Sequence, residues 1–304
     1  MRIWLDTDLG SDVDDALALA YALHHPEIEL VGISTVFGDV ELRTRCVEAL
    51  LEIEGQGSIP VLTGLGKPLT ERRAGVMFGH EGKGLLTDPH PQMKITSENE
   101  KEQKHRIEQL AENLHRTSPD YLVAIGPLTN LGALLAAERP LPPLAIMGGK
   151  SENAVIPGMN DRIAEWNLFS DPVAARAVFE AESDQPLLIA PAEVTFRTAL
   201  EASDLDALSA GNPLCSMLRT LCDHWLRFLA DDFGMAEPRV ALHDPLTIAL
   251  LMEPDLCPLE SRRVEVDDKG NLISVAGKPN IEIATDVDIP ALRSHLIETW
   301  LRDA

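Results

Sequence analysis

The chain has 304 residues, of which 45% are hydrophobic and 25% are charged, as is usual for a globular protein. Its formal net charge of −23 argues against nucleic acid or an anionic membrane as a partner, because both repel an acidic surface. No apolar run reaches the roughly 18 residues of a membrane-spanning helix, so no membrane span is expected.

The sequence has no Ser/Gly linker, internal repeat or low-complexity tract, which predicts a single domain over residues 1–304. Its first residues form a strand-like run that reaches an acid at Asp6, and this is not the pattern of a signal peptide. None of the four cysteines belongs to a Cys-x-x-Cys pair, so no disulfide framework is expected. Together these features predict a cytoplasmic protein.

The first part of the chain alternates buried-strand patterns with helix patterns. Strands are predicted over 2–8, 29–38 and 59–64, and helices over 13–25 and 42–55. This strand-helix-strand order predicts a parallel sheet with helices on both faces. Residues 67–104 follow without clear periodicity, and a connection of this length in a compact protein is often functional.

The remaining elements continue this alternation. Helices are predicted over 107–117, 127–139, 171–181, 203–233, 244–253 and 289–302, strands over 120–126, 144–149 and 186–194, and a β-hairpin over 262–275. The expected fold class is α/β, with an open, mostly parallel sheet flanked by helices. Ligands of such sheets bind outside the carboxyl ends of the strands, where several of these strands end in a polar or glycine-containing turn.

Five aspartates crowd the turn after the first predicted strand: Asp6, Asp8, Asp12, Asp14 and Asp15. At about 4 Å two carboxylates repel by roughly 4 kcal/mol at an effective dielectric near 20, so water, a helix N-terminus or a cation must compensate. A helix capped by Ser11 or Asp12 accounts for two acids, whereas a hard cation such as Ca²⁺ or Mg²⁺ accounts for more. An EF-hand is excluded, because leucines occupy the twelfth positions where its glutamate is required.

Three further segments carry candidate site residues, each with a structural alternative. His80 lies in the glycine-rich GHEGKG segment and is either a site residue or a surface-loop histidine. In AEWN, an acid and an amide flank a tryptophan at 165–167, which suits hydroxyl recognition but also occurs in ordinary loops. His243 and Asp244 precede a proline, the pattern of a helix start. The local sequence leaves these alternatives open.

Six segments together resemble the inosine–uridine preferring nucleoside hydrolase family over about residues 1–253: DTDLGSDVDDALAL, VFGDVELRTR, AIGPLTNLGALL, MGG, AEWNLFSDPVAA and HDPLTIAL. The resemblance implies an open α/β sheet with a tightly bound Ca²⁺ at the base of a ribose pocket. The implied activity is hydrolysis of the N-glycosidic bond of nucleosides to base and ribose. A small-molecule nucleoside is the implied partner, and a homodimer or homotetramer the implied assembly.

The resemblance also assigns roles to residues. It assigns metal binding to Asp8, Asp15, Asp244 and the main-chain carbonyl of Ile125. It assigns the ribose hydroxyls to Asp14, Asn160, Glu165 and Asn167. The segment between Asp8 and Asp14 is two residues longer than the family's DxDPGxDDA opening, so either Asp12 or Asp14 takes the ribose or metal role.

Catalysis in such a site would pass through an oxocarbenium-like sugar, stabilised by the surrounding carboxylates and amides. Asp8 is the expected general base, and His243 matches the family's histidine near the leaving base. The substrate pocket is further expected to contain Asp39, His80, Met147 and Trp166. Aromatic residues of the 203–235 region, such as Trp225, either reach this pocket or pack in the core.

Two other classes of function fit parts of the sequence. The Asp-x-Asp after the first strand resembles the haloacid dehalogenase phosphatases, but Gly10 stands where those enzymes require Thr or Val. A metal-dependent sugar or nucleoside binding protein without turnover would use the same acids. Release of phosphate would identify the first class, and binding without turnover would identify the second.

Overall fold

The computed structural model describes residues 1–304 except 72, 93, 96–98, 157–164 and 303–304. Its central sheet has eight strands, and only the pairing of β10 with β13 is antiparallel. Across the sheet the order is β10 (Leu259–Arg262), β13 (Ile281–Ala284), β9 (Leu187–Ala190), β7 (Leu144–Met147), β6 (Tyr121–Ala124), β1 (Arg2–Thr7), β2 (Glu29–Thr35) and β3 (Val61–Thr63). The predicted open, mostly parallel α/β sheet is confirmed.

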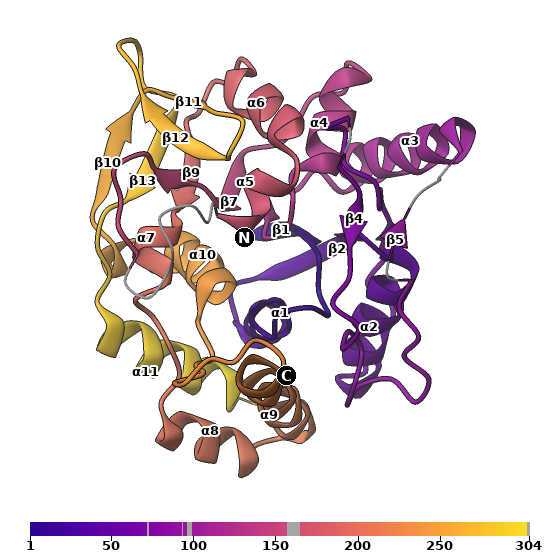
Figure 1. The fold of residues 1–304 in the computed structure, drawn as a ribbon, viewed down its shortest axis with the longest axis vertical. Coiled ribbons are helices and arrows are strands. Elements are labelled where there is room, and N and C mark those ends of the chain that lie inside the picture. Colours follow the sequence, from indigo (N-terminus) through magenta and orange to yellow (C-terminus); the bar gives the residue numbers. More distant parts are fainter. Residues whose placement is uncertain (72, 93, 96–98, 157–164, 303–304) are drawn as a thin grey trace.

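Helices cover both faces of the sheet, as Figure 1 shows. One face packs against α1 (Asp14–His24), α2 (Val40–Ile53), α9 (Pro213–Asp231), α10 (His243–Met252) and α11 (Ile289–Trp300). The other packs against α3 (Glu100–Thr117), α4 (Thr129–Ala136) and α6 (Pro172–Glu180). Side chains alternate along each strand, so Ile3 and Leu5 join the first core and Trp4 the second.

Shorter elements surround this framework. They are β4 (Gly75–Val76), β5 (Lys94–Ile95), β8 (Lys150–Ser151), α5 (Trp166–Ser170), α7 (Ala192–Thr195), α8 (Ala202–Ser209), the 3₁₀ turn Pro254–Leu256, β11 (Val264–Val266) and β12 (Asn271–Ser274). The predicted hairpin is confirmed, because β11 and β12 pair antiparallel, and β12 also pairs with β8. In the described part of the chain, no helix has the length and apolar character needed to cross a membrane.

Two predicted elements end earlier than expected for local backbone reasons. The strand predicted over 29–38 stops at Thr35, because Phe37 and Gly38 adopt φ values of 65° and 74° that turn the chain away from the sheet. The strand predicted over 186–194 stops at Ala190, and Pro191 then begins the short helix α7. Both turns lie at the carboxyl edge of the sheet.

The helix predicted over 203–233 is two helices, α8 and α9. Asn212 accepts a hydrogen bond from the N–H of Cys215, and Pro213 occupies the first helical position. A capping asparagine followed by proline is a strong helix start, so the chain reorients between the two helices. The reorientation directs α9 toward the loop that follows β1.

Candidate active site

The predicted acid cluster lies at the carboxyl end of β1. Asp8 follows the strand, and Asp14 and Asp15 form the first turn of α1, with 7%, 4% and 3% of their surfaces exposed. Thr7 Oγ1 donates a hydrogen bond to the Asp15 carboxylate and accepts one from the N–H of Leu9. The tight loop therefore holds the acids beneath the surface instead of in solvent.

The alternative of a side-chain cap on α1 by Ser11 or Asp12 is not confirmed. The N-cap position is Val13, which makes no side-chain cap, and Asp12 Oδ1 instead accepts the N–H of Val13 at 2.6 Å. Capping by Ser11 or Asp12 therefore does not explain the charge density. The helix macrodipole still favours Asp14 and Asp15 in the first turn, but that effect is about 1 kcal/mol.

A second helix brings a further acid to the cluster. The helix α10 packs against α1, and its first turn places Asp244 so that Asp14, Asp15 and Asp244 each offer a carboxylate oxygen within 4.8 Å of the others. Burial, and next repulsion from Asp12 and Asp15, raises the pKa of Asp14 well above the ordinary value. Burial, and next repulsion from Asp14 and Asp15, does the same for the pKa of Asp244. Burial and the neighbouring Asp8 do the same for the pKa of Asp15.

Such a cluster is stable only when the acids are protonated or a cation lies among them. Its donor set consists of carboxylate oxygens, which suit a hard divalent ion such as Ca²⁺ or Mg²⁺ better than a transition metal. The residues present therefore fit a metal-binding role.

The ends of β6 and β7 supply backbone oxygens next to the acids. Asn167 Nδ2 donates to the carbonyl oxygens of Ile125 and Met147, at 3.0 and 3.1 Å. Glu165 caps α5, and its carboxylate accepts the N–H groups of Asn167 and Leu168 at 2.6 and 2.9 Å. It also accepts the N–H of residue 149 at 2.8 Å. These hydrogen bonds fix the side chains of Glu165 and Asn167, the acid and the amide of the AEWN segment.

His243 begins α10 and is held on both sides of its ring. Its Nδ1 lies 2.7 Å from Thr195 Oγ1, and its ring meets Phe196 edge-on at 4.5 Å. The Thr195 hydroxyl also lies 3.5 Å from the carbonyl oxygen of Ala192. Burial, and to a lesser extent Arg239, lowers the pKa of His243 to about 4, so the ring is neutral at pH 7.

One cavity of about 250 Å³ gathers most of the predicted site residues. Its lining comprises Asp8, Ser11, Asp12, Asp14, Asp15, Phe78, Ile125, Met147, Glu165, Trp166, Asn167, Phe196, Trp225, His243 and Asp244. The acids, amide and carbonyls are polar groups suited to a sugar, whereas the aromatic residues supply flat apolar surface. This division matches the two halves of a nucleoside.

Three predicted residues are not among this lining. Asn160 lies outside the described residues. Asp39 is the N-cap of α2: its Oδ1 accepts the N–H of Leu42 at 3.1 Å, and its Oδ2 accepts the N–H of Gln92 at 2.8 Å. Both of its oxygens therefore serve local structure.

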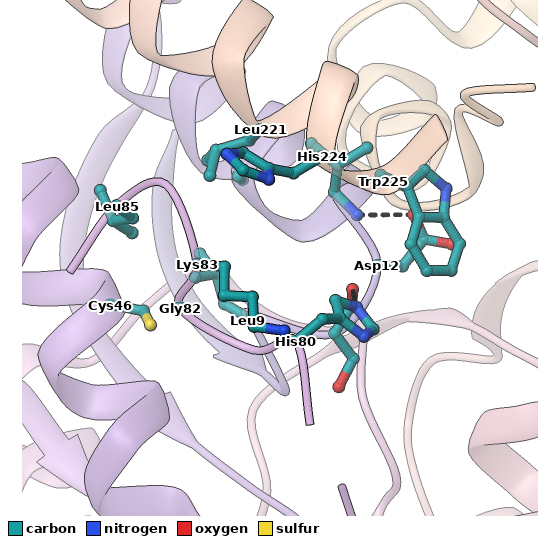
Figure 2. Close-up of a pocket in the computed structure, with 14 residues that line it drawn as sticks. Leu9, Asp12, Cys46, His80, Gly82, Lys83, Leu85, Leu221, His224 and Trp225 are labelled. Carbon is teal, nitrogen blue, oxygen red and sulfur yellow. Dashed lines mark hydrogen bonds between the residues drawn. The ribbon is translucent and has the colours of Figure 1, made fainter. Parts of the chain in front are cut away.

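The third, His80, lines a smaller neighbouring cavity of about 40 Å³. Figure 2 shows that cavity between Leu221, His224 and Trp225 of α9 on one side and Leu9, Gly82 and Lys83 on the other. His80 Nε2 lies 2.6 Å from the carbonyl oxygen of Ser11, and its ring centroid lies 3.8 Å from that of Phe228. Ser11 and Trp225 border both cavities, so the two adjoin.

Sequence reasoning missed two kinds of residue at this site. Phe78 and Phe196 line the cavity from segments without helical or strand periodicity, so no pattern marked them. Arg43 lies on α2, where a charged residue is normally solvent-exposed, but its guanidinium is buried beside the Asp8 loop. Trp225 fulfils both alternatives that the sequence left open, because it lines the cavity and also packs against the hydrophobic core.

Comparison with known proteins agrees with this geometry. The family model described as inosine-uridine preferring nucleoside hydrolase matches residues 3–294. The pyrimidine-specific ribonucleoside hydrolase RihA of Salmonella enteritidis is 31% identical over 309 residues, covering 95% of this chain and 94% of the relative. RihA of Escherichia coli O9:H4 is 31% identical over 307 residues, with the same coverage of each chain.

Solved structures show the same fold. The plant nucleoside hydrolase PpNRh1 superposes with a TM-score of 0.80 at 23% identity, covering 99% of this chain and 98% of that one. A purine-preferring ribonucleoside hydrolase from Gardnerella vaginalis gives 0.78 at 23% identity, with the same coverage. With the family match across almost the whole chain, this protein belongs to the inosine-uridine preferring nucleoside hydrolase family and is an N-glycosidase.

Proposed function

We propose that this enzyme hydrolyses ribonucleosides to free base and ribose in a Ca²⁺-dependent reaction. The observation that carries the proposal is the convergence of Asp14, Asp15 and Asp244 at the wall of a cavity that is also lined by polar groups, such as Glu165 and Asn167, and by aromatic rings. An all-oxygen cluster suits Ca²⁺, and the adjoining polar and aromatic groups suit a ribose and a base.

The resemblance assigns the cation to Asp8, Asp15, Asp244 and the carbonyl of Ile125, all of which line the cavity, while the converging carboxylates are those of Asp14, Asp15 and Asp244. Ca²⁺ held there would supply a Lewis acid that lowers the pKa of a nearby water. Asp8 would accept a proton from the attacking water as the water oxygen forms a bond to C1′ of the ribose. The C1′–N bond would break, its electron pair would leave with the base, and the base nitrogen would take up a proton from solvent water.

The ribose is held by groups that also stabilise the positive charge developing on it. We assign the ribose hydroxyl role to Asp14, since both Asp12 and Asp14 line the cavity but Asp12 Oδ1 already accepts the N–H of Val13. Glu165 and Asn167 are fixed by backbone hydrogen bonds, so they need no reorganisation as charge develops.

The base occupies the aromatic part of the cavity. Phe78 and Trp166 lie 5.7 Å apart between ring centroids, and Trp225 and Phe196 complete the apolar lining. His243 would face the leaving base with a neutral ring that Thr195 holds in place, so it would orient the base by hydrogen bonding. Pyrimidine ribonucleosides are the first substrates to test, because relatives at 31% identity carry the name pyrimidine-specific ribonucleoside hydrolase.

A reducing-sugar assay tests the proposal. Uridine, cytidine, inosine, adenosine and guanosine, with their 2′-deoxy forms, are each incubated with the protein in Ca²⁺ and after exhaustive chelation. We expect ribose release that disappears on chelation and in Asp8→Asn, but persists in Asp88→Asn, which alters an exposed acid. Ca²⁺ binding without release from any nucleoside would instead support the binding-protein alternative, and release that survives chelation would contradict the cation dependence.

The homodimer or homotetramer and the cytoplasmic location remain predictions. Sedimentation velocity of the purified protein would decide the first, and fractionation of the source cells the second.

A further inference from the structure

Arg43 is the most unusual charged residue beside the cavity. Its side chain is 1% exposed, although a buried guanidinium is costly unless it is paired and hydrogen-bonded. It also lies in the first turn of α2, where the helix macrodipole disfavours a positive charge. None of the residues lining the larger cavity is a lysine or an arginine. The burial of the Arg43 guanidinium next to this lining therefore calls for an explanation.

The contacts of Arg43 converge on the loop after β1. Its Nη1 donates to the carbonyl oxygen of Asp8 and to that of Leu9, the latter at 3.2 Å. Its Nη2 donates to Ser11 Oγ at 3.1 Å and lies 3.8 Å from the Asp8 carboxylate. Its Nε donates to the carbonyl of Phe37 at 2.6 Å, which ties this loop to the turn after β2.

Ser11 extends the same network to the loop that carries Phe78. The Ser11 hydroxyl lies 3.5 Å from Glu81, a fully buried acid, and the Ser11 carbonyl accepts from His80. Glu81 accepts the N–H groups of Phe78 and Gly79. One guanidinium therefore fixes the acid loop, and through Ser11 it joins that loop to one aromatic wall of the cavity.

We propose that Arg43 is a positioning residue for the reaction, which holds the Asp8 loop in the orientation that cation binding and proton transfer require. The inference rests on the proposed function, since it takes Asp8 as cation ligand and general base. A guanidinium suits the task because its donors lie in a rigid plane and can bond several carbonyls at once. A lysine would keep the charge but could not reproduce this fork.

The test compares Arg43→Lys with Arg45→Lys, an exposed residue on the same helix whose guanidinium donates to the carbonyl of Asp88. Loss of a group that orients a metal ligand typically costs about 10–100-fold in metal affinity or activity. We expect Arg43→Lys to lose kcat and Ca²⁺ affinity on that scale, while KM for the nucleoside changes by less than about threefold. Arg45→Lys should match the wild type in all three.

A second variant tests whether a loss of activity in Arg43→Lys comes only from a destabilised fold. Ser11→Ala removes one partner of Arg43 and leaves the guanidinium in place, so we expect a smaller loss in the same direction, about three- to tenfold. Thermal unfolding of each variant with and without Ca²⁺ shows whether the fold is retained. If Arg43→Lys does not fold, Ser11→Ala decides the question.

The outcomes separate this inference from the proposed function. Wild-type protein that binds Ca²⁺ and releases ribose, with Arg43→Lys and Ser11→Ala behaving like it, would overturn the positioning role alone. Wild-type protein that neither binds Ca²⁺ by calorimetry nor hydrolyses any nucleoside would overturn the proposed function, and the positioning role with it. A loss confined to the melting temperature, with kcat and Ca²⁺ affinity intact in the folded fraction, would show that Arg43 only stabilises the fold.

Discussion

The two ends of the helix pair α1 and α10 carry contrasting clusters. At the N-terminal end, Asp14, Asp15 and Asp244 converge beside the cavity. At the C-terminal end, His25, Glu253 and His295 also place metal-ligating atoms within 4.8 Å of one another. Distance alone therefore does not distinguish the two clusters.

Their surroundings do. In the C-terminal cluster, His295 Nε2 lies 2.7 Å from the Tyr21 hydroxyl, His25 Nδ1 accepts the N–H of Glu27 at 3.2 Å, and Glu253 is exposed to solvent. Burial, and next His295, lowers the pKa of His25, so the ring is neutral without any ion. This cluster is compensated by the protein and by water.

The N-terminal cluster has less compensation, of which the hydrogen bond from Thr7 to Asp15 is one part. In the described part of the chain, no lysine or arginine forms an ion pair with Asp14, Asp15 or Asp244, and Arg43 lies beside Asp8 instead. Buried like charges without an ion-pair partner are the condition under which a cation is needed. Weak compensation of buried charge, rather than convergence of ligands, therefore separates the proposed cation site from the histidine cluster.

The largest expected effect comes from removing one acid of the N-terminal cluster. Asp15→Asn takes away a charge and a carboxylate oxygen that Thr7 orients, so kcat/KM should fall on the order of 10³-fold, as for the loss of one fixed electrostatic group in a buried site. Ca²⁺ affinity, measured by calorimetry, should fall with it. Glu253→Gln is the matched change at the other end of the helices, and an equal loss there would remove the distinction between the two clusters.

A somewhat smaller loss is expected from His243 at the start of α10. His243→Ala should lower kcat by roughly 10²-fold, the low end of the range for a positioned proton-transfer group. Thr195→Val, which removes the hydrogen-bond partner of His243 Nδ1, should lower kcat in the same direction but less. Steady-state kinetics on the best nucleoside would measure both, and an unchanged kcat in His243→Ala would exclude the ring from the chemical step.

Cation removal should destabilise the protein in a pH-dependent manner. Without Ca²⁺, the raised pKa values of Asp14, Asp15 and Asp244 mean that the folded chain binds protons which the unfolded chain, with an ordinary pKa of 3.8, has already released. Stability of the cation-free protein therefore falls as pH rises through the raised pKa values, because the folded state binds more protons than the unfolded state.

Bound Ca²⁺ reverses that loss, because it stabilises the ionised carboxylates. At 100 times its Kd it contributes about 2.7 kcal/mol. Calcium should thus raise the melting temperature more at about pH 8 than at about pH 5, as scanning calorimetry with Ca²⁺ or chelator would show. An increase independent of pH would mean that the acids are already ionised without the cation.

The smallest effect is expected at the C-terminal cluster. His295→Gln removes a hydrogen bond to Tyr21, so it should cost about 1 kcal/mol and lower the melting temperature by a few degrees. Ca²⁺ affinity and kcat should stay within about twofold of the wild type. A large loss of bound metal in this variant would show that the histidine cluster is a second metal site.

The sequence by itself determined the sheet and the acid loop. Periods of strand and helix are local properties, and the polar turn after β1 follows directly from the order DTDLGSDVDD. The family resemblance added the site residues that come from other segments of the chain, and most of the residues that it assigned line the cavity. The helix break at Asn212 was readable in principle, since capping asparagine and proline are local signals.

Only the tertiary structure decided which charges are buried and what opposes them. Asp39 and Asp244 are both acids at the start of a helix. The carboxylate oxygens of Asp39 accept hydrogen bonds from backbone N–H groups, whereas Asp244 lies among other carboxylates. Arg43 looks in the sequence like any surface residue of an amphipathic helix, yet packing of α2 against the loop after β1 buries it. The desolvation and pairing of a charged side chain depend on residues that are distant along the chain, so the local sequence does not predict them.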